Sequence, residues 1–214
     1  GKSSLARELK EASNLVDRVV HIEYDDVARE IQLQGTTCNA FNSDSLGAWR
    51  LSRNIALHRL DQELGRHFFQ EDNTPASRLL IIMDDNFHLR SMRKNVYQIC
   101  QSHANANLYF CILWLDTPLQ VCLDRNRQRP QKSRVPDETI LKMALEAPDP
   151  VKASWEQGWV HFTNNWSTIS IEQIMENSQV VHPPPPPVDP EILEAERRKT
   201  RESLLHKYDG YMRR

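Results

Sequence analysis

The chain has 214 residues, of which 39% are apolar, and a formal net charge of −2. These values predict one globular domain, or one domain with an appendage, and they exclude an overall positive field that would attract a polyanion. The 6 glycines lie too far apart for a G-x-G-x-x-G loop, and the longest apolar run is too short for a membrane span of about 20 residues.

Hydrophobic periodicity predicts alternating helices and strands along most of the chain. In chain order, the patterns indicate helix 2–12, strand 19–24, helix 27–33, helix 45–69 with Ser43 or Asp44 as its N-cap, strand 79–83, helix 91–102, strand 108–115, helix 118–128, helix 136–146, a strand within 155–162, and helix 171–175. The solid apolar runs 79–83 and 108–115 are typical of strands covered on both faces. We therefore expect an α/β domain with a doubly wound parallel sheet flanked by helices.

A run of five prolines at residues 183–187 predicts an extended polyproline segment. It divides the chain into a core domain over residues 1–182, a linker over 183–188 and a charged helical extension over 189–214. The extension carries a basic cluster, which is either a solvated helix face or a contact for RNA phosphates. The cluster consists of Arg197, Arg198, Lys199 and Arg201.

The four cysteines, Cys38, Cys100, Cys111 and Cys122, show no C-x-x-C spacing. Cys111 and Cys122 lie in apolar segments, which favours buried free thiols over a structural disulfide. Free thiols indicate a reducing compartment, so we expect a cytoplasmic protein.

The chain opens with Gly1-Lys2-Ser3-Ser4, followed by a predicted helix. The phosphate-binding loop has the pattern G-x-x-x-x-G-K-[ST], in which the lysine reaches the β/γ-phosphates and the hydroxyl binds magnesium. Only the second half of this pattern is present, and a bare G-K-S also occurs by chance. If the motif is genuine, a strand and the first glycine precede it, and we expect the chain to be a fragment of a longer protein.

Two acidic pairs follow predicted strands. Asp84 and Asp85 close the run 79–83, and Asp25 and Asp26 close the strand 19–24. In an open α/β sheet, ligands bind beyond the carboxyl ends of the strands. A carboxylate there can hold the magnesium of a nucleotide, and another can act as a general base. The alternative is that each pair merely begins a turn or caps a helix.

An arginine pair, Arg125 and Arg129, lies at the end of the predicted helix 118–128, just before Pro130. Two arginines four residues apart share one helix face and are able to grip phosphate oxygens, although a solvated basic face is the simpler reading. Together with G-K-S and the acidic pairs, they favour a phosphoryl-transfer enzyme of the P-loop class.

Residues 80–98, LIIMDDNFHLRSMRKNVYQ, closely resemble a segment of the O-phosphoseryl-tRNA(Sec) kinase family. Further segments match the family's pattern in the same order, which makes the resemblance quite specific. It covers about residues 1–160, and more weakly residues 203–214. The matching segments are Tyr24-Asp25-Asp26-Val27, residues 115–130, residues 136–140, Asp149-Pro150 and Trp155-Glu156.

The resemblance implies transfer of the γ-phosphate of ATP to the serine of seryl-tRNA(Sec), the tRNA for selenocysteine. It implies that Lys2 contacts the phosphates, that Ser3 and Asp84 bind magnesium, and that Asp26 or Asp25 is the base. Gly1, Lys2, Ser3 and Ser4 would bind ATP together with Arg125 and Arg129, and a C-terminal helical region would bind the tRNA. Three other readings stay open: a tRNA-binding regulatory ATPase of the elongator-associated type, a small-molecule P-loop kinase, and a binding module without enzymatic activity.

Overall fold

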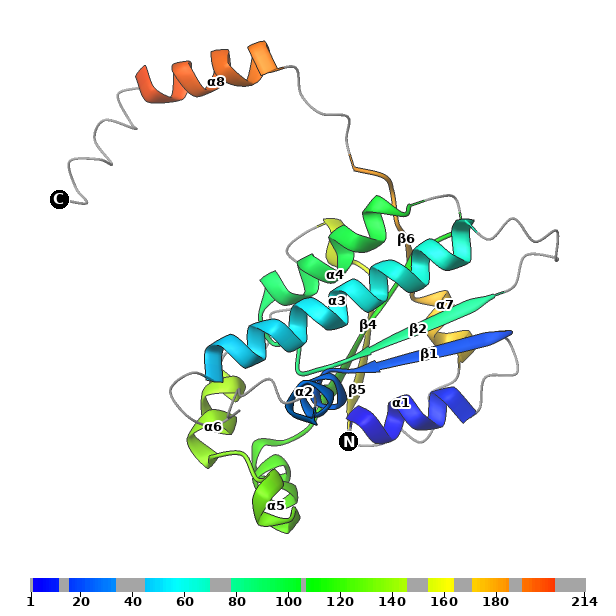
Figure 1. The fold of residues 1–214 in the computed structure, drawn as a ribbon, viewed down its shortest axis with the longest axis vertical. Coiled ribbons are helices and arrows are strands. Elements are labelled where there is room, and N and C mark those ends of the chain that lie inside the picture. Colours follow the sequence, from blue (N-terminus) through cyan, green and yellow to red (C-terminus); the bar gives the residue numbers. More distant parts are fainter. Residues whose placement is uncertain are drawn as a thin grey trace. The chain divides into compact units, whose positions relative to one another are not determined.

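The computed structural model describes residues 2–11, 16–33, 45–69, 78–104, 107–145, 154–163, 171–184 and 190–202. The chain divides into two compact units, Gly1–Pro183 and Pro184–Arg214. Within the first unit the helices and strands follow one another in an α/β order (Figure 1). They are α1 (Lys2–Glu11), β1 (Arg18–Glu23), α2 (Tyr24–Leu33), α3 (Ser45–Phe69), β2 (Leu79–Asp84), α4 (Arg90–Ser102), β3 (Tyr109–Phe110), β4 (Ile112–Asp116), α5 (Leu119–Gln128), α6 (Asp137–Leu145), β5 (Trp159–Thr163), α7 (Ile171–Glu176) and β6 (Gln179–Val180), with short 3-10 turns at Gln131–Ser133 and Ser154–Glu156.

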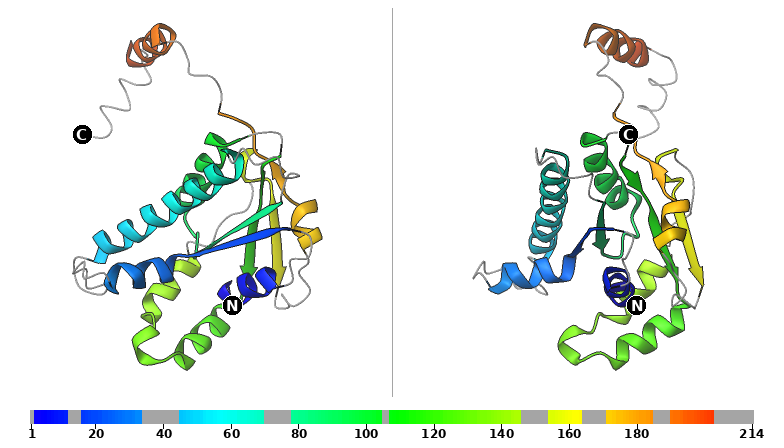
Figure 2. Two further views of the ribbon diagram at one scale, coloured as in Figure 1. Left: turned by 45° about the vertical axis from the view of Figure 1, so that its right-hand side comes forward. Right: turned by 90° about the vertical axis from the view of Figure 1, so that its right-hand side faces the viewer.

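The strands form three separate pairs in the part of the chain that the structure describes. β1 pairs with β2 in parallel, β4 pairs with β5 in parallel, and the short β3 and β6 pair antiparallel. Figure 2 shows that the β1–β2 and β4–β5 pairs run in clearly different directions. The predicted α/β class with parallel strands and flanking helices is confirmed, but its sheet is divided between β2 and β4.

Opposite faces of the β1–β2 pair pack against different helices. Alternate residues of a strand point to opposite faces. One face packs against the core formed with α2, α3 and α4. The strand residues on this face are Val20, Ile22, Ile81 and Met83, and the helix residues include Val27, Ala56, Leu60 and Val96. Leu80 and Ile82 instead join the second core, together with Leu5 and Leu9 of α1, Leu113 and Leu115 of β4, and Ile171 and Ile174 of α7.

A cavity of about 1820 Å³ extends from the start of α1 between β2 and β4. Its inner part is lined by apolar residues of the second core, including Leu9, Ile82 and Leu113. Its polar rim contains functional candidates, among them Lys2, Ser3, Asp25, Asp84, Arg125 and Arg129. The volume exceeds the roughly 300–1,000 Å³ that ligand pockets usually have.

Several predicted elements differ from the observed ones at their ends. Tyr24 is buried and begins helix α2 directly after β1, so Asp25 and Asp26 lie in the first turn of a helix rather than at a strand end. The predicted strand 108–115 is interrupted at Cys111 into β3 and β4. Pro118 and Pro136 precede the helices α5 and α6, which begin one residue later than expected.

Gly158, just before β5, occupies a position without room for a side chain. A Cβ atom there would lie 2.6 Å from the carbonyl oxygen of Phe110 and 3.0 Å from the backbone nitrogen of Gln179. The glycine therefore permits the close approach of β3, β5 and the turn before β6.

In the second unit, helix α8 spans Pro190–Glu202 and exposes Arg197, Arg198 and Lys199. Residues 185–189 and 203–214, which include most of the expected polyproline segment and the end of the expected helical extension, lie outside the described residues. So do Cys38 and the expected cap residues Ser43 and Asp44. No helix in the described ranges combines the length and apolar character needed to cross a membrane.

Cys100, Cys111 and Cys122 are free thiols, as predicted. Burial raises the pKa of Cys100 to about 12 and that of Cys111 to about 11. Because the thiolate is the reactive form, both should resist iodoacetamide at pH 8 in the folded protein and react readily in urea. Mass spectrometry of the alkylated peptides measures this difference, and rapid labelling of Cys100 without denaturant would contradict it.

Candidate functional site

The start of α1 is tied to the ends of β1 and β2. The Lys2 Nζ atom donates a hydrogen bond to Asn86 Oδ1 at 2.8 Å, just after β2. The Ser3 hydroxyl donates to Glu23 Oε1 at 3.4 Å, at the end of β1. A helix N-terminus presents free backbone N–H groups and a partial positive charge, which suits phosphate. Gly1 lies outside the described residues, and Ser4 follows within the first turn of the helix.

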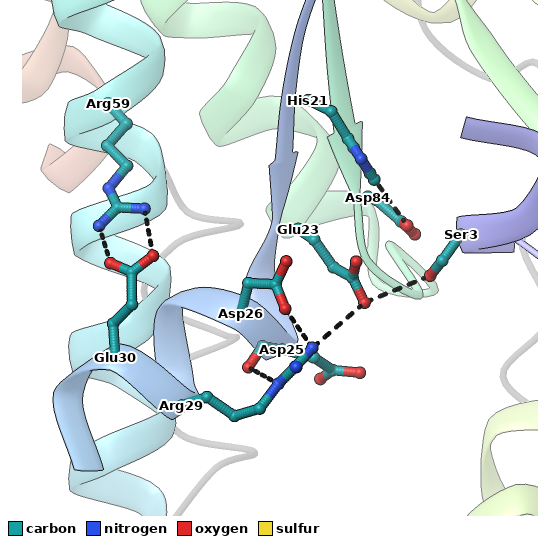
Figure 3. Close-up of polar contacts among 9 residues, drawn as sticks. All are labelled: Ser3, His21, Glu23, Asp25, Asp26, Arg29, Glu30, Arg59 and Asp84. Carbon is teal, nitrogen blue, oxygen red and sulfur yellow. Dashed lines mark hydrogen bonds and ion pairs between the residues drawn. The ribbon is translucent and has the colours of Figure 1, made fainter. Parts of the chain in front are cut away.

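Three side chains at the ends of β1 and β2 converge on one face of the strand pair (Figure 3). Glu23 is the register partner of Asp84, and His21 lies two residues earlier on the same face as Glu23. The His21 Nε2 atom lies 3.3 Å from Asp84 Oδ2. One ligand atom of each of the three lies within 4.8 Å of those of the other two, close enough to surround one metal ion.

Negatively charged carboxylates lie close together in and beside this cluster. Burial raises the pKa of Glu23 above its ordinary value, and the negative charges of Asp26 and Asp84 raise it further. Burial also raises the pKa of Asp85, against the opposing effects of the Asn86 backbone N–H, Arg53 and Lys2. A cation placed among these carboxylates would relieve their repulsion.

The first turn of α2 carries both candidate base residues. Arg29, one turn further along the helix, pairs with the Asp26 carboxylate and donates to the Asp25 backbone carbonyl at 3.3 Å. Asp25 lines the large cavity with Lys2, whereas Asp26 lines a separate pocket of about 400 Å³ between β1 and α3. The two carboxylates therefore face different spaces, although they are adjacent in sequence.

The loop after β2 is held by a buried ion pair. Within this loop, Phe87 has a φ of 45°, which is uncommon for a residue with a side chain. Arg93 donates to the carbonyls of Phe87 at 2.7 Å and His88 at 3.0 Å. Its Nε atom also lies 2.8 Å from Glu156 Oε1, and only 5% and 1% of the two side chains are exposed. Arg93 thus links the loop beside Asp84 to the turn before β5.

The arginine pair is placed differently from the prediction. Arg125 lies in α5, but Arg129 follows the helix in an extended conformation, so the two do not share a regular helix face. Both are exposed and line the rim of the same cavity as Ser3 and Asp84. Among the described residues, none forms a hydrogen bond or ion pair with either guanidinium group.

Four residues of this site were not predicted from the sequence: His21, Glu23, Arg29 and Asn86. The i, i+2 spacing of His21 and Glu23 in a strand placed both on one face, but only the register with β2 brings them to Asp84.

The Ser3 hydroxyl and the carboxylates of Glu23 and Asp84 are oxygen donors of the kind that magnesium takes, whereas the ring nitrogen of His21 is not. Glu23 lies between the other two oxygen donors, since it accepts from the Ser3 hydroxyl and is the register partner of Asp84.

A helix that begins with Lys-Ser beside carboxylates at the ends of parallel strands defines an α/β protein of the P-loop class. A comparison with family models agrees with this class. Residues 1–148 match the model of the AAA domain, and the chain belongs to that family.

Two curated proteins are similar to part of the chain. The L-seryl-tRNA(Sec) kinase of Homo sapiens is 49% identical over 86 residues, 39% of this chain and 23% of the relative. The L-seryl-tRNA(Sec) kinase of Mus musculus is 46% identical over 80 residues, 36% of this chain and 21% of the relative. The matched segments therefore span less than a quarter of either relative.

Proposed function

We propose that the whole protein transfers the γ-phosphate of ATP to the serine hydroxyl of seryl-tRNA(Sec) and so supplies phosphoseryl-tRNA(Sec) for selenocysteine biosynthesis. The observation that carries this proposal is the 46–49% identity to two L-seryl-tRNA(Sec) kinases. The cluster of Lys2, Ser3 and Asp84 at the carboxyl ends of parallel strands supports it independently. The names of these relatives favour a kinase over a regulatory ATPase or a small-molecule kinase.

In the proposed reaction, Asp26 accepts the proton of the seryl hydroxyl, with Asp25 as the alternative base. The hydroxyl oxygen forms a bond to the γ-phosphorus, and the bond between that phosphorus and the oxygen of ADP breaks. Lys2 contacts the β/γ-phosphates, and Ser3 and Asp84 hold magnesium. The ion, when bound with ATP, neutralises charge on the phosphate oxygens.

The direct test uses the whole protein with ATP labelled in its γ-phosphate. Serine-charged selenocysteine tRNA and serine-charged ordinary serine tRNA are compared in parallel. We expect label on the first tRNA and much less on the second. Absence of label on both would overturn the kinase proposal, and ATP hydrolysis without labelled tRNA would support the regulatory ATPase.

We propose that Arg125 and Arg129 bind the phosphates of ATP, because both line the cavity and neither pairs with a described residue. A hydrogen bond to a charged group contributes about 1.5–3 kcal/mol, so Arg125→Ala should raise the KM for ATP about 10- to 150-fold. Arg127→Ala is the matched control, since Arg127 pairs instead with Asp124 of the same helix and with Asp137 of α6. Equal effects of both substitutions on steady-state ATP kinetics would contradict the role.

We further propose that the cavity between β2 and β4 receives the strand expected before Gly1. The cavity has an apolar lining, lies between two parallel strand pairs and reaches the start of α1. A strand there would join both pairs through backbone hydrogen bonds and would lead into the phosphate loop. We also propose a core domain over residues 1–182, a linker over 183–188 and an extension over 189–214; the division of the chain into compact units at Pro183 supports this.

We propose that the extension contributes to tRNA binding through its basic cluster. Arg197, Arg198 and Lys199 are exposed on α8, and Arg201 follows on the same helix. Such residues add affinity for RNA phosphates that falls as salt concentration rises. The free thiols support a reducing compartment, and we propose the cytoplasm.

A further inference from the structure

Glu23 has no role in the reaction proposed above, yet it contacts a proposed magnesium ligand. It lies at the last position of β1, and 12% of its side chain is exposed. The Ser3 hydroxyl donates to its Oε1 atom at 3.4 Å, and Asp84 is its partner in the strand register. The structure thus pairs the Ser3 hydroxyl with a carboxylate of β1, whereas Asp84 of β2 pairs with His21.

We propose that Glu23 and His21 are positioning residues for the magnesium ligands: Glu23 orients the Ser3 hydroxyl, and His21 orients the Asp84 carboxylate. This inference rests on the magnesium–nucleotide part of the proposed function and not on the identity of the phosphate acceptor.

The chemistry of a hydroxyl ligand explains the role of Glu23. A serine oxygen that binds a cation through a lone pair still carries a hydrogen atom, and that hydrogen needs an acceptor. A carboxylate acceptor directs the O–H bond toward itself and leaves the oxygen lone pairs for the ion. Outer partners of this kind fix the orientation of metal ligands, and their loss typically weakens metal binding about 10- to 100-fold.

The position of Glu23 is itself secured by a neighbouring cation. Arg29 of α2 lies 3.9 Å from the Oε1 atom that accepts from Ser3, and it also pairs with Asp26 (Figure 3). A continuous set of contacts therefore joins Ser3, Glu23, Arg29 and Asp26. Through it, the proposed metal ligand is connected to the proposed base.

His21 lies on β1 as Glu23 does, and its role follows from its contact with Asp84 on the neighbouring strand β2. Its Nε2 atom lies 3.3 Å from Asp84 Oδ2, so one carboxylate oxygen is engaged and the other stays available to the ion or its water. Only 12% of the His21 side chain and 5% of the Asp84 side chain are exposed, so water competes little for this contact.

The test measures the affinity of the whole protein for Mn²⁺ in the presence of ADP, by electron paramagnetic resonance of the free ion. We expect Glu23→Ala to weaken Mn²⁺ binding about 10- to 100-fold. Glu23→Gln retains an amide oxygen that accepts from Ser3, so its loss should be smaller. ADP affinity without metal should be unchanged in both. Unchanged Mn²⁺ affinity in Glu23→Ala, or an equal loss of metal-free ADP binding, would overturn the proposal.

A double-mutant cycle separates orientation of Ser3 from a general effect of charge. In the Ser3→Ala background, Glu23→Ala should change Mn²⁺ affinity by less than about twofold, because its partner is already absent. If Glu23→Ala still weakens Mn²⁺ binding about 10- to 100-fold in this background, Glu23 does not act through Ser3, and this half of the proposal is overturned. Glu63→Ala is the matched control: Glu63 is a similarly covered carboxylate, paired with Arg18 and Arg66 rather than with Ser3.

The histidine is tested in the same assay. His21→Leu removes the donor and should weaken Mn²⁺ binding, while His21→Gln retains an N–H donor and should restore part of it. His161→Leu is the control, because His161 forms a similar pair with Asp116, at 3.1 Å, at the other strand pair. Equal affinities for His21→Leu and the unaltered protein would overturn this half of the proposal. Failure of the unaltered protein to bind Mn²⁺ with ADP would overturn all of it, whereas absence of tRNA labelling alone would affect only the proposed acceptor.

Discussion

Replacement of Asp26 by asparagine is expected to lower the rate of phosphate transfer about 10²- to 10⁴-fold, the usual contribution of a general base. Asparagine has nearly the same shape but does not accept a proton from the seryl hydroxyl. ATP binding should be largely retained, because Asp26 lines the small pocket beside α3 and not the cavity that contains Lys2 and Ser3. Single-turnover transfer and equilibrium ATP binding measure the two effects separately.

Asp25→Asn is the matched variant for this experiment. Asp25 lies in the same helical turn but faces the large cavity. If Asp26 is the base, Asp25→Asn should retain much more transfer than Asp26→Asn. The reverse order would assign the base to Asp25, and loss of ATP binding in Asp26→Asn would contradict its assignment as the base.

Replacement of Glu156 by alanine is expected to lower the free energy of unfolding by about 3–5 kcal/mol, because it leaves a buried guanidinium without its partner. Arg93 is almost fully buried, and Arg90 also contacts Glu156, at 3.0 Å. Domains of this kind are stable by only about 5–15 kcal/mol, so the variant should be close to unfolding. Urea denaturation followed by circular dichroism measures the change.

The control for this prediction is an ion pair on the surface. Asp124 pairs with Arg127 at 3.2 Å, and about half of each side chain is exposed. Asp124→Ala should cost only about 0.2–1 kcal/mol, the usual range for exposed pairs. A similarly small effect of Glu156→Ala would contradict the proposed importance of the buried pair for the loop after β2.

The longer elements of the core could be predicted from the sequence because their patterns are local. Periodicity of apolar residues predicts the helix 45–69, and an unbroken apolar run predicts the strand 79–83. The two-residue strand β6 could not be predicted, since it is too short to show a period, and the break at Cys111 that separates β3 from β4 leaves no mark in the apolar run 108–115. The abrupt change from β1 to α2 at Tyr24 was missed because Asp25 and Asp26 suit a strand end and the first turn of a helix equally well.

The site was predictable only where it follows local motifs. Lys2, Ser3 and Asp84 stand out because G-K-S and a carboxylate after an apolar strand are recognisable along the chain. The contacts of Glu23 with Ser3 and of His21 with Asp84 depend on strand register and on where α1 packs. The Arg93–Glu156 pair joins residues 63 positions apart, and no local pattern indicates such a pair.

The identity of the reaction product tests the proposed kinase activity most directly. The whole protein is incubated with ATP, magnesium and serine-charged selenocysteine tRNA, and the amino acid is then released from the tRNA and identified by mass spectrometry. We expect O-phosphoserine, formed in proportion to ADP. Release of unmodified serine alone, with or without ATP hydrolysis, would contradict the proposed kinase activity.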